Sequence, residues 1–192
     1  MPPAILFLDA NVLYSACCRD LLLELAIAGL CQCRWSEQVL DETRRALQRA
    51  RPQVSDRDCA RLFQLMSQAC PNALHHAHRA SLPSDGAYAA LDDLHVAQAA
   101  YAAQAYAILT FNLKDFRSSS LAALGLRVLS PDTWLTELNA REPVRCLRAV
   151  ENCRRRLRRP RLSRQAHLQA MHHAGLSQFA AQLARKPRGP AP

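Results

Sequence analysis

Close to its first residue the chain carries an apolar run that ends in an acid, Ala4-Ile5-Leu6-Phe7-Leu8-Asp9. Its apolar residues hardly alternate with polar ones, which is typical of a strand buried on both faces of a parallel sheet. A second such run, Tyr106-Ala107-Ile108-Leu109-Thr110, leads to Asn112. Because ligands of open α/β sheets gather at the carboxyl ends of the strands, we expect Asp9 and Asn112 to lie beside one site.

Segments with helical spacing separate the strand-like runs. This alternation predicts an α/β fold with a parallel sheet of four to five strands flanked by helices. We expect strands at residues 4–8, 31–35, 106–110 and 127–129. We expect helices at residues 20–30, from Ser36 to the break at Pro52, at 56–69, at 91–105, from Ser130, and at 142–158 and 163–184, with a loop over 71–90.

The composition describes a globular chain of one domain, or of one domain with an appendage. Of the 192 residues 49% are hydrophobic, and no apolar run approaches the roughly 20 residues that span a membrane. The residues Met1-Pro2-Pro3 lack the basic start of a signal peptide, so we expect a cytoplasmic protein without membrane contact. The eight cysteines contain no Cys-x-x-Cys pair, which favours reduced structural thiols.

The net charge of +9 belongs almost wholly to the last quarter of the chain. Residues 1–140 hold 12 basic and 14 acidic residues, whereas residues 141–192 hold 13 and 2. We therefore predict a first domain over 1–140 and a basic helical extension over 141–192. Concentrated arginines favour contact with a nucleic-acid backbone, and the alternatives are a solvated tail or a surface that packs on a partner. The candidate nucleic-acid-binding residues are Arg154, Arg155, Arg156, Arg158 and Arg159.

Acidic and amide residues at the expected strand ends and helix starts look like one metal site. They are Asp9, Glu42, Asp93, Asn112 and Asp115. Carboxylates brought together at a sheet edge repel one another unless a cation joins them, and hard oxygen ligands suit Mg²⁺ or Mn²⁺. This set predicts metal-assisted phosphodiester chemistry.

Ordinary structural interpretations of these residues stay open. Glu42 can pair with Arg45, three residues further along the same helix surface. Asp93 on a first helical turn is stabilised by the helix dipole without a metal. Asp115 can pair with Lys114 on the surface.

Two further polar residues are expected to shape the site. Asn11 can orient Asp9 or a bound water, or it can be an ordinary turn residue that starts a helix. Thr110 can supply a hydroxyl to the site, or it can serve only as a β-branched strand residue.

Four segments, taken together and in order, resemble the PIN-domain family, and within it the VapC-type toxins of bacterial toxin–antitoxin pairs. They are Leu8-Asp9-Ala10-Asn11-Val12-Leu13, Ser36-Glu37-Gln38-Val39-Leu40-Asp41-Glu42, Asp92-Asp93-Leu94-His95-Val96 and Leu109-Thr110-Phe111-Asn112-Leu113-Lys114-Asp115-Phe116. The likeness covers roughly residues 4–137, and the basic extension is similar to one found on some members. No single segment is specific, because an acid after a strand is common.

The resemblance implies a Rossmann-like sheet, Mg²⁺- or Mn²⁺-dependent ribonuclease activity, frequent homodimers and a partner antitoxin. It matches Asp9, Glu42 and Asp93 to the first three acids of the family. The chain departs at the fourth position, which is often Asp and here is Asn112. Some members carry an acid three residues later, here Asp115, so either residue can complete the site.

Two other classes of function compete with a ribonuclease. A non-catalytic nucleic-acid-binding or scaffold protein would use the basic extension, and Asn112 in place of Asp keeps that interpretation open. A phosphatase or receiver-like domain would use Asp9 as a phosphoryl acceptor, but the expected lysine motif at a strand end is missing. The sequence carries no P-loop, Gly-x-Gly-x-x-Gly or Gly-x-Ser-x-Gly motif.

Overall fold

A parallel sheet lies at the centre of the computed structural model, which describes residues 3–75, 82–83, 87–157 and 160–185. Its strands are β1 (Ala4–Leu8), β2 (Cys31–Arg34), β3 (Ala107–Leu109) and β4 (Arg127–Leu129). They form a four-stranded sheet in the order β2-β1-β3-β4, and all three pairings are parallel. The predicted α/β class and parallel sheet are therefore confirmed.

The central strand β1 fixes the position of the first acid. Leu6, Phe7 and Leu8 are fully buried, as expected for a strand covered on both faces. The register pairs Leu8 with Leu109, so the residues that follow these two strands lie side by side. The backbone N–H of Asp9 donates to the carbonyl of Leu109, which carries the pairing one residue beyond the strand.

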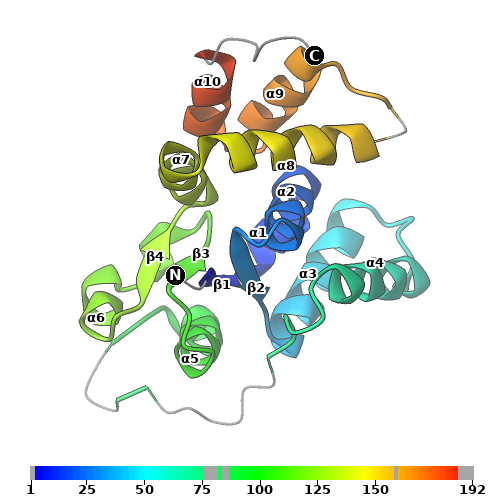
Figure 1. Ribbon diagram of the computed structural model, residues 1–192. Helices are drawn as coiled ribbons and strands as arrows, with labels where there is room; N and C mark the ends of the chain where they lie inside the picture. The colour runs from blue at the N-terminus through cyan, green and yellow to red at the C-terminus, as the bar shows by residue number, and fades with distance from the viewer. Residues whose placement is uncertain (1–2, 76–81, 84–86, 158–159, 186–192) are drawn as a thin grey trace.

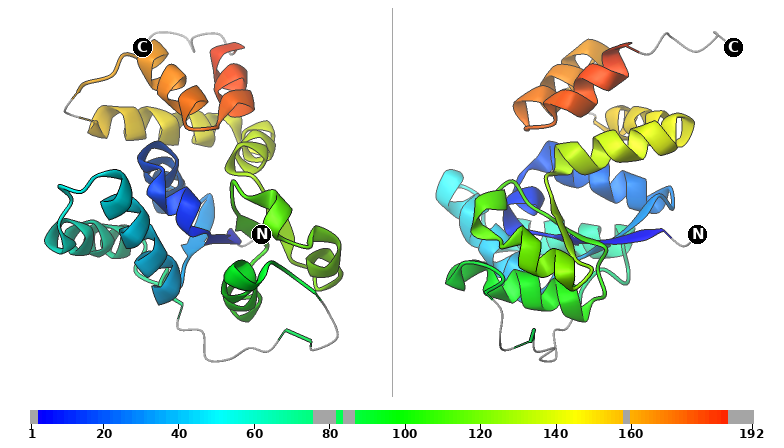
Figure 2. Two further views of the ribbon diagram at one scale, coloured as in Figure 1. Left: turned by 180° about the vertical axis from the view of Figure 1, so that it is seen from behind. Right: turned by 90° about the vertical axis from the view of Figure 1, so that its left-hand side faces the viewer.

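Helices cover the sheet on both sides (Figures 1 and 2). In the first 141 residues they are α1 (Ala10–Tyr14), α2 (Ala16–Ile27), α3 (Glu37–Ala50), α4 (Asp56–Ala69), α5 (Leu94–Ala102), α6 (Ser118–Ala123) and α7 (Pro131–Arg141). Two short 3-10 helices, η1 (Leu91–Asp93) and η2 (Leu113–Asp115), precede α5 and α6. Within the described residues, no helix is both long and apolar enough to cross a bilayer.

Several predicted helix boundaries were wrong. The helix expected at 20–30 is α2, which begins four residues earlier and ends before Gly29 with its φ of 68°. The segment expected as one helix over 91–105 begins as the 3-10 helix η1 and ends at Ala102. The short helices α1 and α6 were not expected, because five or six residues are too few to show a periodic pattern.

The extension consists of α8 (Pro143–Arg156), α9 (Arg164–His173) and α10 (Ser177–Arg185). The sequence predicted one helix over 163–184, but Gly175 adopts a φ of 83° and separates two. Helix α8 contacts α2 and α7, and α10 contacts α7 and α9. The domain boundary at residue 140 stays a prediction.

The sequence of the extension carries an apolar stripe at near-helical spacing, namely Leu168, Met171, Leu176, Phe179 and Leu183. Leu168 is partly buried. Met171, Leu176 and Phe179 are fully buried, and Leu183 is 1% exposed. The stripe had allowed the alternative that the extension packs on a partner antitoxin or on the second subunit. That alternative is wrong for these side chains, because the helices of the same chain already cover them.

A buried carboxylate joins the extension to the first helix after the sheet. Asp132 in α7 is 6% exposed, and its carboxylate accepts hydrogen bonds from the backbone N–H groups of Gln178 at 3.0 Å and Phe179 at 2.9 Å. These N–H groups belong to the first turn of α10, where no intrahelical partner exists. Asp132 therefore caps α10 from another helix.

We predict that Asp132→Ala lowers the free energy of unfolding by about 1–3 kcal/mol, because it leaves two N–H groups of α10 without an acceptor. Urea unfolding of the purified variants measures this. Asp132→Asn is the matched control, since its amide oxygen still accepts a hydrogen bond, and it should lose less. Equal midpoints for wild type and Asp132→Ala would contradict the capping role.

Candidate metal centre

Asp9 is held by three hydrogen bonds at the carboxyl end of β1. Its Oδ1 accepts from the backbone N–H of Ala10 at 2.6 Å, which makes Asp9 the N-cap of α1. Its Oδ2 accepts from Asn11 Nδ2 at 2.7 Å and from Thr110 Oγ1 at 2.6 Å. The side chain is only 4% exposed. The carboxylate therefore has a fixed orientation at the sheet edge.

Burial raises the pKa of Asp9 above its usual range. The hydrogen bonds from Thr110, Ala10 and Asn11 and the charge of His95 oppose this shift. The environment thus stabilises the charged form mainly through neutral donors, and burial still outweighs them. A cation bound beside this carboxylate would lower the same pKa.

Asn11 and Thr110 join the end of β1 to the loop that follows β3. The amide of Asn11 donates to Thr110 Oγ1 at 3.0 Å, and its carbonyl oxygen accepts from the backbone N–H of Phe111 at 3.0 Å. The hydroxyl of Thr110, which is fully buried, accepts from the N–H of Asn112 at 2.9 Å. These bonds hold the loop against Asp9.

Glu42 lies on α3 and faces the same region from another element. Its carboxylate pairs with His95 Nε2 at 2.8 Å, and its side chain is 30% exposed. The surface alternative for Glu42 invoked Arg45, but its partner in the structure is His95. The other ring nitrogen of His95, Nδ1, is buried and has no hydrogen-bond partner among the described residues. His95 was not singled out from the sequence, although it lies two residues after Asp93 in one of the quoted segments.

Asp93 ends η1 and precedes α5, half-buried beside the other acids. Its pKa is raised, first by burial and then by the negative charges of Asp9, Asp115 and Glu42, while His95 lowers it. The carboxylates of β1, α3, η1 and η2 therefore act on one another across a common space. The neighbouring Asp92 is exposed.

Asn112 and Asp115 occupy the loop after β3. The side-chain amide of Asn112 donates to the carboxylate of Asp115. This contact, rather than an ion pair with Lys114, is what the structure shows for Asp115. Asn112 is exposed and Asp115 is half-buried, so both are reachable from the same space.

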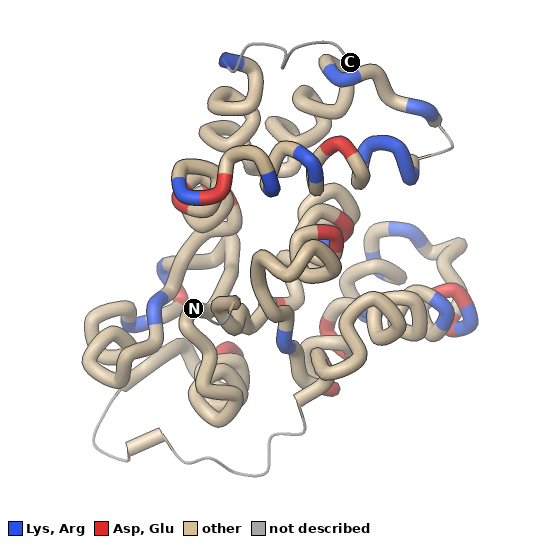
Figure 3. Tube along the Cα trace, viewed as in Figure 1, with Lys and Arg blue, Asp and Glu red and all other residues tan. Residues whose placement is uncertain are grey.

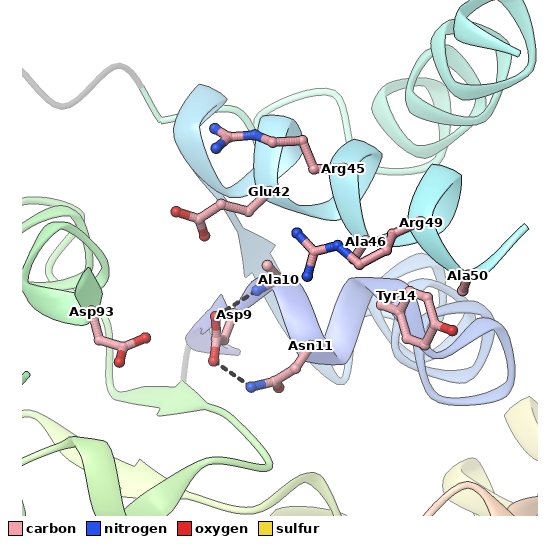
Figure 4. Close-up of a pocket in the computed structure, with 10 residues that line it drawn as sticks. All are labelled: Asp9, Ala10, Asn11, Tyr14, Glu42, Arg45, Ala46, Arg49, Ala50 and Asp93. Atoms are coloured by element: carbon pink, nitrogen blue, oxygen red, sulfur yellow. Dashed lines mark hydrogen bonds between the residues drawn. The ribbon is translucent and has the colours of Figure 1, made fainter. Parts of the chain in front are cut away.

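An open cleft of about 510 Å³ lies beside three of the acids, and Asn112 and Asp115 are not among the residues that line it (Figure 4). It is lined by Asp9, Asn11, Glu42 and Asp93, and also by Tyr14, Arg45 and Arg49. In the part of the chain that the structure describes, no three acidic, histidine or cysteine side chains are grouped closely enough to hold an ion as they stand. The donors are hard oxygens, the ligand type that Mg²⁺ and Mn²⁺ prefer.

Three of the arginines predicted to bind nucleic acid, Arg154, Arg155 and Arg156, lie in the last turn of α8, and Figure 3 colours Lys and Arg blue. Arg154 and Arg155 both pair with Glu151, and Arg156 pairs with the buried Glu24 of α2 at 3.1 Å. These three charges are therefore partly neutralised. Arg158 and Arg159 lie outside the described residues.

The turn between α9 and α10 contacts the loop of the candidate site. A Cβ atom on Gly175 would lie 3.0 Å from the ring of Phe111. The N–H of Phe111 donates to Asn11, which in turn donates to Asp9. The extension thus packs against a residue that is hydrogen-bonded to the network around the first acid.

The comparisons with known families place this architecture. A model described as PIN domain matches residues 6–114, and a model described as VapC50 C-terminal domain matches residues 131–185. The chain therefore belongs to the PIN-domain family. Within it, the chain is a VapC-type protein with a C-terminal extension. No curated protein and no solved structure gives a significant match.

We predict that Thr110→Val lowers the free energy of unfolding at neutral pH by about 1–3 kcal/mol, because a buried carboxylate loses a hydrogen-bond donor. Thr110→Ser keeps the hydroxyl and is the matched control. Chemical unfolding of both variants decides the question. If the valine and serine variants prove equally stable, the hydroxyl has no such role.

Proposed function

We propose that the protein is a metal-dependent endoribonuclease and the toxin of a toxin–antitoxin pair. The observation that carries this proposal is the cleft at the carboxyl end of β1, which Asp9, Glu42 and Asp93 line from three separate elements. Acids that converge at the carboxyl edge of a parallel sheet fit a cation site. Membership of the PIN-domain family and the match to a VapC extension support a toxin nuclease.

In this proposal Asp9, Asp93 and the pair Asn112 and Asp115 hold Mg²⁺ or Mn²⁺. The ion, when bound, supplies positive charge to the scissile phosphate and lowers the pKa of the attacking water. Glu42 is now turned toward His95, and Asp115 toward Asn112. We expect these side chains to reorient when the mutual repulsion of the acids is offset.

The residues of the chain have separate roles in the proposed reaction. Glu42 orients the attacking water and accepts its proton, and Asp115 completes the negative charge of the site. Asn11 and Thr110 keep Asp9 in position through the hydrogen bonds described above. The resemblance to VapC-type toxins implies products with a 5′-phosphate and a 3′-hydroxyl.

The proposed biological setting follows from the family. We place the protein in the cytoplasm, as a homodimer, with cellular RNA as its substrate and an antitoxin protein as its inhibitor. The arginines at the end of α8 would add contacts to the RNA backbone that do not depend on sequence.

We predict that Asp9→Asn lowers the rate of RNA cleavage about 100-fold or more, because it weakens the hold on the metal. The measurement is cleavage of labelled cellular RNA by protein freed of any partner, with Mg²⁺ or Mn²⁺ and with EDTA. Asp92→Asn is the matched control, since Asp92 is exposed and does not line the cleft.

Cleavage that requires both the metal and Asp9, and that survives in Asp92→Asn, supports the nuclease. Cleavage that persists unchanged in Asp9→Asn or in EDTA contradicts it. A folded wild-type protein that binds RNA without cutting it would favour the non-catalytic nucleic-acid-binding alternative.

A further inference from the structure

The cleft beside the acids is also lined by two arginines. Arg45 and Arg49 lie four residues apart on α3 and are both exposed. The buried residues of this helix are Val39, Thr43 and Leu47, so the two arginines stand on a neighbouring face. They line the same cleft as the acids, as Figure 4 shows.

The two arginines do not neutralise the acids. Asp9 accepts hydrogen bonds from Ala10, Asn11 and Thr110, and Glu42 pairs with His95, so the contacts of these acids are not with the two arginines. Among the described residues Arg45 and Arg49 have no ion-pair or hydrogen-bond partner, whereas Arg44 of the same helix pairs with Asp41. Two arginines without a partner therefore line the same cleft as the acids.

Arginines without a partner in a cleft fit a polyanion that lies along it. A guanidinium binds phosphate oxygens in a bidentate manner and stays charged at every physiological pH. Four residues of helix separate the two arginine backbones by about 6 Å. This is comparable to the step between neighbouring phosphates on an extended strand. The phosphate that is cut would lie beside the acids, and the arginines would hold those next to it.

An aromatic ring lines the cleft as well. Tyr14, at the end of α1, lines the cleft and is 39% exposed, although most large apolar side chains of the chain are buried. A base stacks on such a ring only after it has left a double helix, because paired bases are already stacked. The ring therefore favours a single-stranded ligand over a duplex.

We propose that Arg45, Arg49 and Tyr14 form the substrate-binding part of the cleft and take two phosphates and one unpaired base of single-stranded RNA next to the scissile bond. This inference rests on the proposed function and specifies its substrate. It also assigns the close RNA contact to α3. The arginines at the end of α8 are in contrast engaged with Glu151 and Glu24.

The test measures binding of a short fluorescent oligouridine, alone and annealed to oligoadenine, at several potassium chloride concentrations. The Asp9→Asn protein is used so that no cleavage occurs. The double variant R45Q/R49Q should lower the slope of log affinity against log salt by about 1.4, because two phosphate contacts are lost. The matched control is R57Q/R61Q, which removes two exposed arginines at the same spacing from α4.

The role of Tyr14 is tested separately. Tyr14→Ala should weaken binding of the single strand about tenfold, whereas Tyr14→Phe keeps the stacking face and should bind like the parent protein. The annealed duplex should bind more weakly than the single strand and should not respond to either Tyr14 variant.

An unchanged salt slope in R45Q/R49Q, or an equal loss in R57Q/R61Q, overturns the inference, and so does the absence of any binding to oligouridine. Failure here is distinguishable from failure of the proposed function. If cleavage needs Asp9 and metal but R45Q/R49Q leaves the salt slope unchanged, the proposed nuclease is supported and this inference is wrong. If no RNA is cut but the slope drops as expected, the binding cleft stands without the nuclease.

Discussion

Repulsion among carboxylates at one edge of the sheet is the constraint on which the account of this protein depends. Asp9 is restrained by neutral donors, Glu42 by His95 and Asp115 by Asn112. Among the described residues no side chain donates a hydrogen bond to Asp93, whose pKa is raised first by burial and then by the other acids. Such a group of acids is destabilising by itself, and a divalent cation is the natural way to offset it.

The fold brings these acids together from four separate segments. Strand β1 carries Asp9 to the centre of the edge, and its parallel partner β3 carries Thr110 to the same level. Two contacts of the extension involve α10 and the turn before it. Asp132 caps α10, and Gly175 packs against Phe111 in the loop of the site. The turn between α9 and α10, remote in sequence, thereby packs against the loop of the candidate site.

The sequence predicted the class of fold and the strands, because uninterrupted apolar runs that end in polar residues are hard to place anywhere but in a buried parallel sheet. It did not predict the break in the last helix, because the left-handed conformation at Gly175 interrupts the helix without interrupting its apolar spacing. The acids were predicted from their positions after strands and within the four segments that resemble the PIN-domain family. The partners of those acids are contacts between residues distant in sequence, as between Glu42 and His95, and no periodicity reports them. The sequence also did not predict that Arg45 and Arg49 line a cleft with the acids, because the spacing of charges on one helix does not report contacts with other segments.

The most direct test of a metal site among these acids is the binding of Mn²⁺, followed by the loss of the free ion's electron paramagnetic resonance signal. We expect the wild-type protein to bind the ion. Asp93→Asn should weaken binding at least about tenfold, and Asp92→Asn should bind like the wild type. Equal Mn²⁺ affinity in wild type, Asp93→Asn and Asp92→Asn, or no binding by the folded wild-type protein, would contradict the proposed metal site.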